Sequence, residues 1–304
     1  TNPDTWNCLY SFYELNHKFT IDEYCFSKEN ITYKELIEEY QKVMGIDIVV
    51  TNYANEYIVR SLYDKHSTIT SIYPDGILID NYKISKKQKQ EYARSDLFVY
   101  NGLIDKERNL ALELLAINPE LKIIDTAYVL ETEYSPEELW LNPSSLLMMS
   151  QNVRRSLKEY ASSAYLKKDI DEAYNELKIN LSELDAEYRL ASESTNNRTI
   201  IVANSALNYL EKFGLNVICI DDNASQKTLS DAENIIYSGG VSYIFKFNGE
   251  ELSENAKTIM ENYSINTSEL HKLDNITDQE RSEKKDYISI MKDNLESIKK
   301  ELYQ

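Results

Sequence analysis

Oxygen donors dominate the side chains that could do chemistry in this sequence. The chain holds 51 Asp and Glu and 24 Tyr, against three His and three Cys. No Cys-x-x-Cys pair is present, so neither a thiolate zinc site nor a redox motif is expected. The net charge of −18 is compatible with a cation ligand, and it disfavours nucleic acid and anionic membrane surfaces as partners.

Motifs that mark catalytic centres are missing from the sequence. We find no G-x-S-x-G elbow, no P-loop and no G-x-G-x-x-G, and no motif places a Cys beside a His. Cys8 and Cys25 could form a disulfide if the protein is exported, or could be buried free thiols. We therefore expect a binding protein rather than an enzyme.

Two stretches of alternating strands and helices must position any site. The pattern of residues 46–127, and likewise that of residues 199–275, predicts apolar strands separated by helices. This alternation predicts parallel sheets covered by helices on both faces. The strands expected in the first stretch are 46–51, 67–73, 97–101 and 122–125.

A long segment without Gly or Pro, Leu166 to Ser194, lies between these two stretches. Its apolar residues recur at steps of four and three, which predicts one face of an α-helix roughly 43 Å long. They are Ile170, Tyr174, Leu177, Leu181, Leu184 and Tyr188. The segment is either an amphipathic core helix or a rigid strut joining two α/β lobes. The predicted fold is α/β, with two lobes of small, mostly parallel sheets joined by one long rigid helix.

The sequence divides into four regions. Residues 1–45 are aromatic-rich, and we expect them to pack as an extension of the first lobe. We predict an N-terminal lobe at 46–160, the connecting helix at 161–195 and a C-terminal lobe at 196–304. No apolar run approaches the roughly 20 residues of a membrane span.

Six segments in register resemble the metal-binding solute receptors of bacterial ABC transporters, the zinc and manganese group whose two lobes share one long helix. The resemblance covers residues 46–302. It implies an extracytoplasmic component that captures a divalent metal ion and hands it to a membrane permease. The segments are IVVTNY at 48–53, SIYPDG with NYKIS at 71–85, RSDLFVYNG at 94–102, ELWLNP at 138–143, VANSALNYLEKFGL at 202–215 and DYISIMKDNLESIKKEL at 286–302.

The resemblance also implies a ligand set. In that family four loops at the lobe interface supply the metal ligands, often histidines. Here the four positions fall on Asp80, Glu138, Asn204 and Asp274. All four are oxygen donors, which suit Mn²⁺ or Ca²⁺ better than Zn²⁺, so the implied all-oxygen site is atypical of zinc receptors.

Aromatic side chains accompany the ligand positions, whereas the histidines do not coincide with them. Tyr53, Tyr82 and Trp140 should line the cleft or pack in the core. His17, His66 and His271 match none of the four positions, although His271 lies close to Asp274 in the sequence.

Three functions stay open. The first is a divalent-ion receptor (Mn, Ca or Zn), expected to be a monomer held as a lipoprotein at the bacterial cell surface and working with an ABC permease. The second is a receptor of the same fold for a non-metal ligand. The third is a surface protein with a decayed metal site that serves in adhesion or protein interaction.

Overall fold

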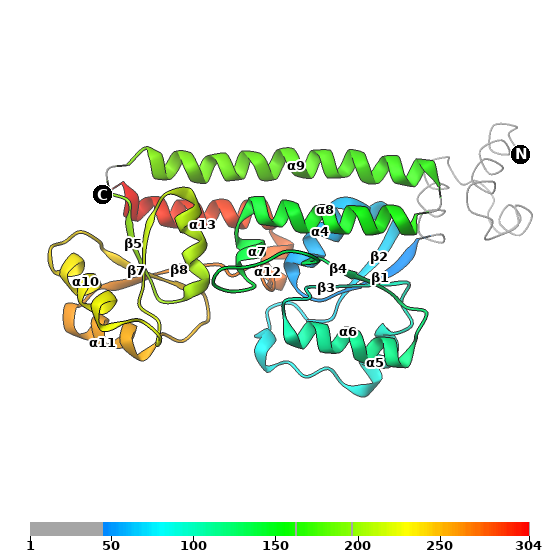
Figure 1. Cartoon of the computed structure of the whole chain (residues 1–304), viewed down its shortest axis with the longest axis horizontal. Coiled ribbons are helices and arrows are strands. Elements are labelled where there is room, and N and C mark those ends of the chain that lie inside the picture. The colour runs from blue at the N-terminus through cyan, green and yellow to red at the C-terminus, as the bar shows by residue number, and fades with distance from the viewer. Residues whose placement is uncertain (1–44, 162, 196, 304) are drawn as a thin grey trace, which may run out of the picture. The chain divides into compact units, whose positions relative to one another are not determined.

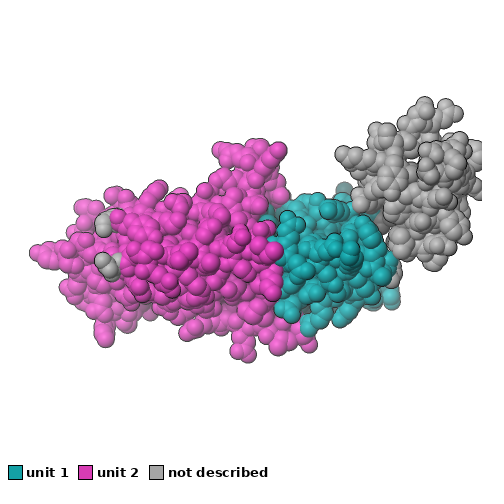
Figure 2. All heavy atoms as spheres, turned by 90° about the horizontal axis from the view of Figure 1, so that it is seen from above, with its two compact units in different colours: residues 1–72, 83–126, 150–176 teal, residues 73–82, 127–149, 177–304 magenta. Residues whose placement is uncertain are grey.

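The computed structural model describes residues 45–161, 163–195 and 197–303 (Figure 1). The predictions for the N-terminal extension and for Cys8 and Cys25 lie outside these residues. The described chain divides into two compact units (Figure 2). Unit 1 takes the chain up to Ile72, Lys83–Thr126 and Ser150–Glu176, and unit 2 takes Tyr73–Tyr82, Ala127–Met149 and the chain from Leu177 onward. The four regions expected from the sequence stay a prediction.

Unit 1 is built on a sheet of four parallel strands in the order β2-β1-β3-β4. The apolar strands β1 and β3 occupy the centre, where side chains on both faces are buried. The strands are β1 (Ile46–Val50), β2 (Ser67–Ser71), β3 (Leu97–Tyr100) and β4 (Lys122–Asp125). Between them lie α4 (Tyr53–Tyr63), η1 (Asp64–His66), α5 (Lys86–Tyr92) and α6 (Asp105–Ile117).

Unit 2 repeats this topology in a second four-stranded parallel sheet, ordered β6-β5-β7-β8. Its strands are β5 (Thr199–Val202), β6 (Asn216–Cys219), β7 (Tyr243–Phe247) and β8 (Asn266–Leu270). They are connected by η3 (Ser205–Phe213), α10 (Gln226–Tyr237) and α11 (Glu254–Tyr263). In both sheets the strand order reverses beside the first strand, and ligands of open α/β sheets bind outside the carboxyl ends of the strands at such a point.

Three local features differ from what the sequence indicates. The sequence predicts a helix at 206–213 that Gly214 ends, and a loop at 136–143. The helix is a 3₁₀ helix, η3. The loop contains a short helix, α7 (Glu138–Leu141), and α8 (Pro143–Tyr160) starts at Pro143, a residue favoured in the first helical position. Strand β8 was not among the expected elements, because its sequence NTSEL is polar and lies at a sheet edge.

The long segment without Gly or Pro forms one unbroken helix, α9 (Ala164–Glu193), which begins in unit 1 and ends in unit 2 (Figure 1). All six residues of its predicted apolar face are buried. In unit 2 it packs on α13 (Tyr287–Leu302), where the Tyr188 hydroxyl donates to the Met291 carbonyl at 2.8 Å. The two parallel sheets and this helix confirm the predicted fold class. None of the helices in the described ranges has the length and apolar character needed to cross a membrane.

Candidate cation site

A pocket of about 230 Å³ opens in unit 2 and is lined by three segments, residues 76–80, 248–250 and 271–277. The second segment follows β7 and the third follows β8, so both lie at the carboxyl edge of the sheet. The first belongs to the loop 73–82, which carries the short helix η2 (Ile79–Asn81). The pocket is therefore placed where ligands of parallel sheets are usually bound.

The turn after β8 is held in an unusual conformation. Leu273 has a φ of 61° and a fully buried side chain. A left-handed conformation costs a non-glycine residue about 1–2 kcal/mol, so surrounding contacts must maintain it. The Leu273 N–H donates to His271 Nδ1 at 2.9 Å, and Trp140 Nε1 donates to the Lys272 carbonyl at 2.9 Å. The side chain of Asn294 bonds both the N–H and the carbonyl of His271.

Loop 73–82 is fastened to the segment that follows this turn. Asn275 Nδ2 donates to the carbonyls of Pro74 and Ile77, at 3.0 and 2.9 Å. Arg281, in α12 (Asp278–Ser282), forms a bidentate ion pair with Asp75. These contacts bring Asp80 to the wall of the pocket that also contains Asp274.

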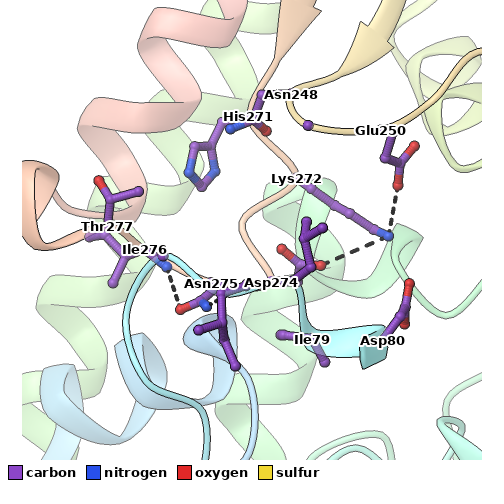
Figure 3. A pocket seen from close by; sticks show the side chains of 14 residues that line it. Ile79, Asp80, Asn248, Glu250, His271, Lys272, Asp274, Asn275, Ile276 and Thr277 are labelled. Carbon is purple, nitrogen blue, oxygen red and sulfur yellow. Dashed lines mark hydrogen bonds and ion pairs between the residues drawn. The ribbon is translucent and has the colours of Figure 1, made fainter. Parts of the chain in front are cut away.

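The ammonium of Lys272 lies among carboxylates of this region. Figure 3 shows the Lys272 side chain reaching toward Glu250 and Asp274. Lys272 Nζ lies 3.0 Å from Glu250 Oε1, 3.8 Å from Asp274 Oδ2 and 3.7 Å from Glu137 Oε1. The Lys272 side chain is only 19% exposed, so its charge is incompletely solvated and depends on these neighbours.

The pKa values of the pocket residues follow from burial and from this charge arrangement. Burial lowers the pKa of Lys272, but the carboxylates of Glu250 and Asp274 outweigh it, so the net shift is upward and the ammonium is charged at neutral pH. Burial raises the pKa of Asp274 despite the opposing charges of Lys272 and His271. Burial lowers the pKa of His271, although Glu280, 3.3 Å away, opposes the shift.

Glu138, one of the four residues implied as ligands, lies outside the lining of the pocket. Its carboxylate is buried and accepts hydrogen bonds from the backbone N–H groups of Tyr134 and Ser135. Lys212 Nζ lies 3.4 Å from its other oxygen. In this structure the Glu138 carboxylate therefore holds the start of α7 and pairs with Lys212.

Both polar atoms of the Asn204 side chain also have hydrogen-bond partners. Its Oδ1 accepts from the Ala206 N–H at 2.9 Å and caps η3. Its Nδ2 donates to Glu250 Oε2 at 2.8 Å. The structure thus places Asp80 and Asp274 in one pocket and connects Asn204 to it through Glu250, with all four residues in unit 2.

The three aromatic residues expected near the cleft are placed in packing roles. Tyr53 starts α4 in unit 1, and its side chain is buried. Tyr82 stacks edge-on against Tyr73, with ring centroids 5.8 Å apart. Trp140 is buried, and its indole Nε1 donates a hydrogen bond to the Lys272 carbonyl in the turn after β8.

Sequence reasoning missed Glu250 and Lys272. Glu250 carries a usable signal, because it follows a predicted strand at the edge where ligands gather. Lys272 carries no such signal, because two of its three carboxylate neighbours, Glu137 and Glu250, come from other segments of the chain. Across residues 45–161, 163–195 and 197–303, no group of three or more His, Cys, Asp or Glu side chains is arranged to hold a metal ion.

The corresponding edge of unit 1 is closed by a buried carboxylate. Glu107, in α6, accepts from Thr51 Oγ1 at 2.6 Å, from the Asn101 N–H at 2.7 Å and from Asn52 Nδ2 at 3.0 Å. Thr51 and Asn52 follow β1 and Asn101 follows β3, so Glu107 fills the switch point of this sheet. Burial raises the pKa of Glu107 from 4.5 to about 7 against these three hydrogen bonds.

Residues 48–301 match the family described as zinc-uptake complex component A, periplasmic, or ZnuA. The chain belongs to the ZnuA family. This is a family of uptake components rather than of enzymes, in agreement with the prediction.

Among curated ZnuA relatives, the zinc-binding protein AdcA of Streptococcus pyogenes is 28% identical over 168 residues, which span 53% of this chain and 32% of AdcA. The zinc-binding lipoprotein AdcA of Streptococcus pneumoniae is 24% identical over 174 residues, 55% of this chain and 34% of AdcA. The match therefore spans about a third of the length of these relatives.

Solved structures of ZnuA-like proteins share the fold. The Zn(II)-bound ZnuA-like domain of Streptococcus pneumoniae AdcA superposes with a TM-score of 0.68 at 21% identity, covering 86% of this chain and all of that domain. The metal-dependent lipoprotein YcdH of Bacillus subtilis gives 0.70 at 19% identity, over 85% of this chain and all of YcdH. These similarities establish the two-lobe α/β fold with a long connecting helix.

Proposed function

We propose that this chain is the solute-binding component of an ABC transporter and captures a divalent metal ion for uptake. The observation that carries the proposal is the match to the ZnuA family over residues 48–301. Relatives named as zinc-binding proteins and as a lipoprotein support metal capture by a membrane-anchored protein. We expect it to be a monomer outside the cytoplasm that delivers its ion to a permease.

The pocket in unit 2 is the proposed ion site. Asp80 and Asp274 both line it, and Glu250 supplies a further carboxylate beside them. Glu138 and Asn204, the other two implied ligands, would join only by giving up their present hydrogen bonds. A donor set of oxygens favours Mn²⁺ or Ca²⁺ over Zn²⁺.

Metal analysis and thermal shift test this function. The protein is purified without chelator, its metal content is measured, and melting is recorded with Mn²⁺, Ca²⁺ and Zn²⁺. A bound ion stabilises the fold by mass action, about 2.7 kcal/mol at a hundredfold excess over Kd. We expect Mn²⁺ or Ca²⁺ to raise Tm more than Zn²⁺ does.

A pair of variants locates the ion. Asp274→Ala should abolish the rise in Tm, because it removes a carboxylate of the pocket. Asp231→Ala, which removes an exposed carboxylate of α10, should leave the rise intact. Equal effects of the two substitutions, or no response of the parent protein to any ion, would contradict the proposed site.

A second function is favoured by the position of Lys272. Its ammonium lies where a bound cation would meet the carboxylates of Glu250 and Asp274. This arrangement fits a protein of the same fold whose metal site has decayed and which binds a non-metal ligand or serves in adhesion. Absence of metal from the purified protein, together with melting that no divalent ion changes, would support this alternative.

A further inference from the structure

The charges of the unit 2 pocket are unevenly balanced. Three carboxylates lie within ion-pair distance of the Lys272 ammonium, and Asp80 lies on the wall of the same pocket. The three are Glu137, Glu250 and Asp274. Like charges so close together raise the free energy of the pocket unless a cation lies among them. Lys272 supplies that cation from the chain itself.

A divalent ion and the Lys272 ammonium would need the same oxygens. Oxygen ligands bind Mn²⁺, Ca²⁺ or Mg²⁺ at about 2.0–2.6 Å. Lys272 Nζ is 3.0 Å from Glu250 and 3.8 Å from Asp274. An ion bound to both of these carboxylates would therefore lie within a few ångströms of Nζ, and strong repulsion would prevent both cations from staying there.

The main chain at this position is fixed independently of the ammonium. Trp140 Nε1 donates to the carbonyl of Lys272, and the conformation at Leu273 is held by the hydrogen bond to His271. Exchanging the Lys272 side chain for an uncharged one of similar length leaves these contacts in place. The charge of Lys272 can therefore be removed without dismantling the turn.

We propose that Lys272 is a built-in competitor of the transported ion, which must displace its ammonium from Glu250, Asp274 and Glu137 in order to bind. The proposal rests on the proposed function and adds the residue that sets ion affinity. Removing the ammonium should tighten divalent-ion binding, whereas an ordinary structural salt bridge would give weaker binding or none when broken.

The test compares ion affinities of full-length variants by isothermal titration calorimetry with Mn²⁺, and with Ca²⁺ and Zn²⁺ in parallel. Lys272→Met removes the charge and keeps the length of the side chain. Lys272→Arg keeps the charge. Lys285→Met is the matched control, because it removes an ammonium that pairs with Asp293 away from the pocket. We expect Lys272→Met alone to bind the ion at least tenfold more tightly than the parent protein.

The outcomes separate this inference from the proposed function. If the parent binds no ion but Lys272→Met does, the inference holds and ion capture by the parent is refuted. If the parent binds an ion and Lys272→Met binds it equally or more weakly, the inference is overturned and the proposed function stands. If no variant binds any ion, both are overturned.

A measurement on the parent protein covers the case in which Lys272→Met does not fold. Acetic anhydride modifies lysine amines according to their accessibility, and mass spectrometry reports each site. Displacement by Mn²⁺ should increase modification of Lys272 and leave Lys285 unchanged. Unchanged or reduced modification of Lys272 at an Mn²⁺ concentration that raises Tm would overturn the inference, and so would the lack of any Mn²⁺ effect on both Tm and modification.

Discussion

The buried carboxylate of Glu107 should make the stability of unit 1 depend on pH in a direction opposite to that of most carboxylates. Its pKa is raised from 4.5 to about 7 by burial. Between these two pH values the folded chain binds more protons at this site than the unfolded chain does. The free energy of unfolding therefore falls as pH rises through this window, and the contribution levels off above about pH 7.

The size of the effect follows from the pKa. A tenfold change in an acid constant is worth about 1.4 kcal/mol, so a shift from 4.5 to about 7 corresponds to about 3 kcal/mol. Glu107→Gln removes the titration and leaves every other carboxylate in place. The difference in stability between the parent protein and this variant should therefore change by about 3 kcal/mol between pH 4.5 and pH 8.

Urea unfolding followed by circular dichroism at several pH values measures this difference. Hydrogen exchange of peptides from β3 and α6, corrected for the intrinsic pH dependence of exchange, assigns it to unit 1. Glu113→Gln, an exposed change on the same helix, is the control and should follow the parent at all pH values. Parallel stability curves for the parent and Glu107→Gln would refute the reasoning, because they would mean that Glu107 titrates normally in the fold.

Two further substitutions test the supports of the pocket. Tyr287→Phe removes a buried hydroxyl that donates to the Trp140 carbonyl at 2.6 Å. The free energy of unfolding, measured with urea, should fall by about 1–3 kcal/mol. An unchanged urea midpoint would mean that water replaces the hydroxyl. Arg281→Lys removes the bidentate pairing with Asp75. Loop 73–82 should then exchange its amide hydrogens faster, while β5 and β7 keep their protection against hydrogen exchange. Equal exchange in loop 73–82 of parent and variant would show that the hydrogen bonds of Asn275 and of the Gly76 N–H hold the loop without Arg281.

The regular parts of the fold could be predicted because their signals are local. The apolar face of α9 follows from periodicity alone, and all six of its predicted residues are buried. Strand β3 is apolar throughout and β1 is apolar except for Asp47, so both could be recognised as short apolar runs. Strand β8 could not be recognised, because an edge strand with polar residues lacks both alternation and an apolar run. Helix α7 has only four residues, too few to show any period.

The candidate site was harder to predict because side-chain partners decide it. A resemblance can assign Glu138 to a ligand position, but it cannot show that the carboxylate turns toward the N–H groups of Tyr134 and Ser135. Asp80 and Asp274 do line one pocket, and their role as ligands stays a prediction. No sequence pattern marks Lys272, whose neighbours Glu137 and Glu250 become close only when three segments meet.

The interleaving of the two units also affects how the chain folds during synthesis. Loop 73–82 is held by Asn275 and Arg281, and Asn275 bonds Pro74 across 201 residues of sequence. At about 5–20 residues per second, a ribosome needs roughly 10–40 s to cover that distance. Throughout that interval the sheet of unit 1 can form, but loop 73–82 of unit 2 lacks its contacts with Asn275 and Arg281. The pocket can therefore be complete only after α12 has left the ribosome, so it is assembled late in the synthesis of this protein.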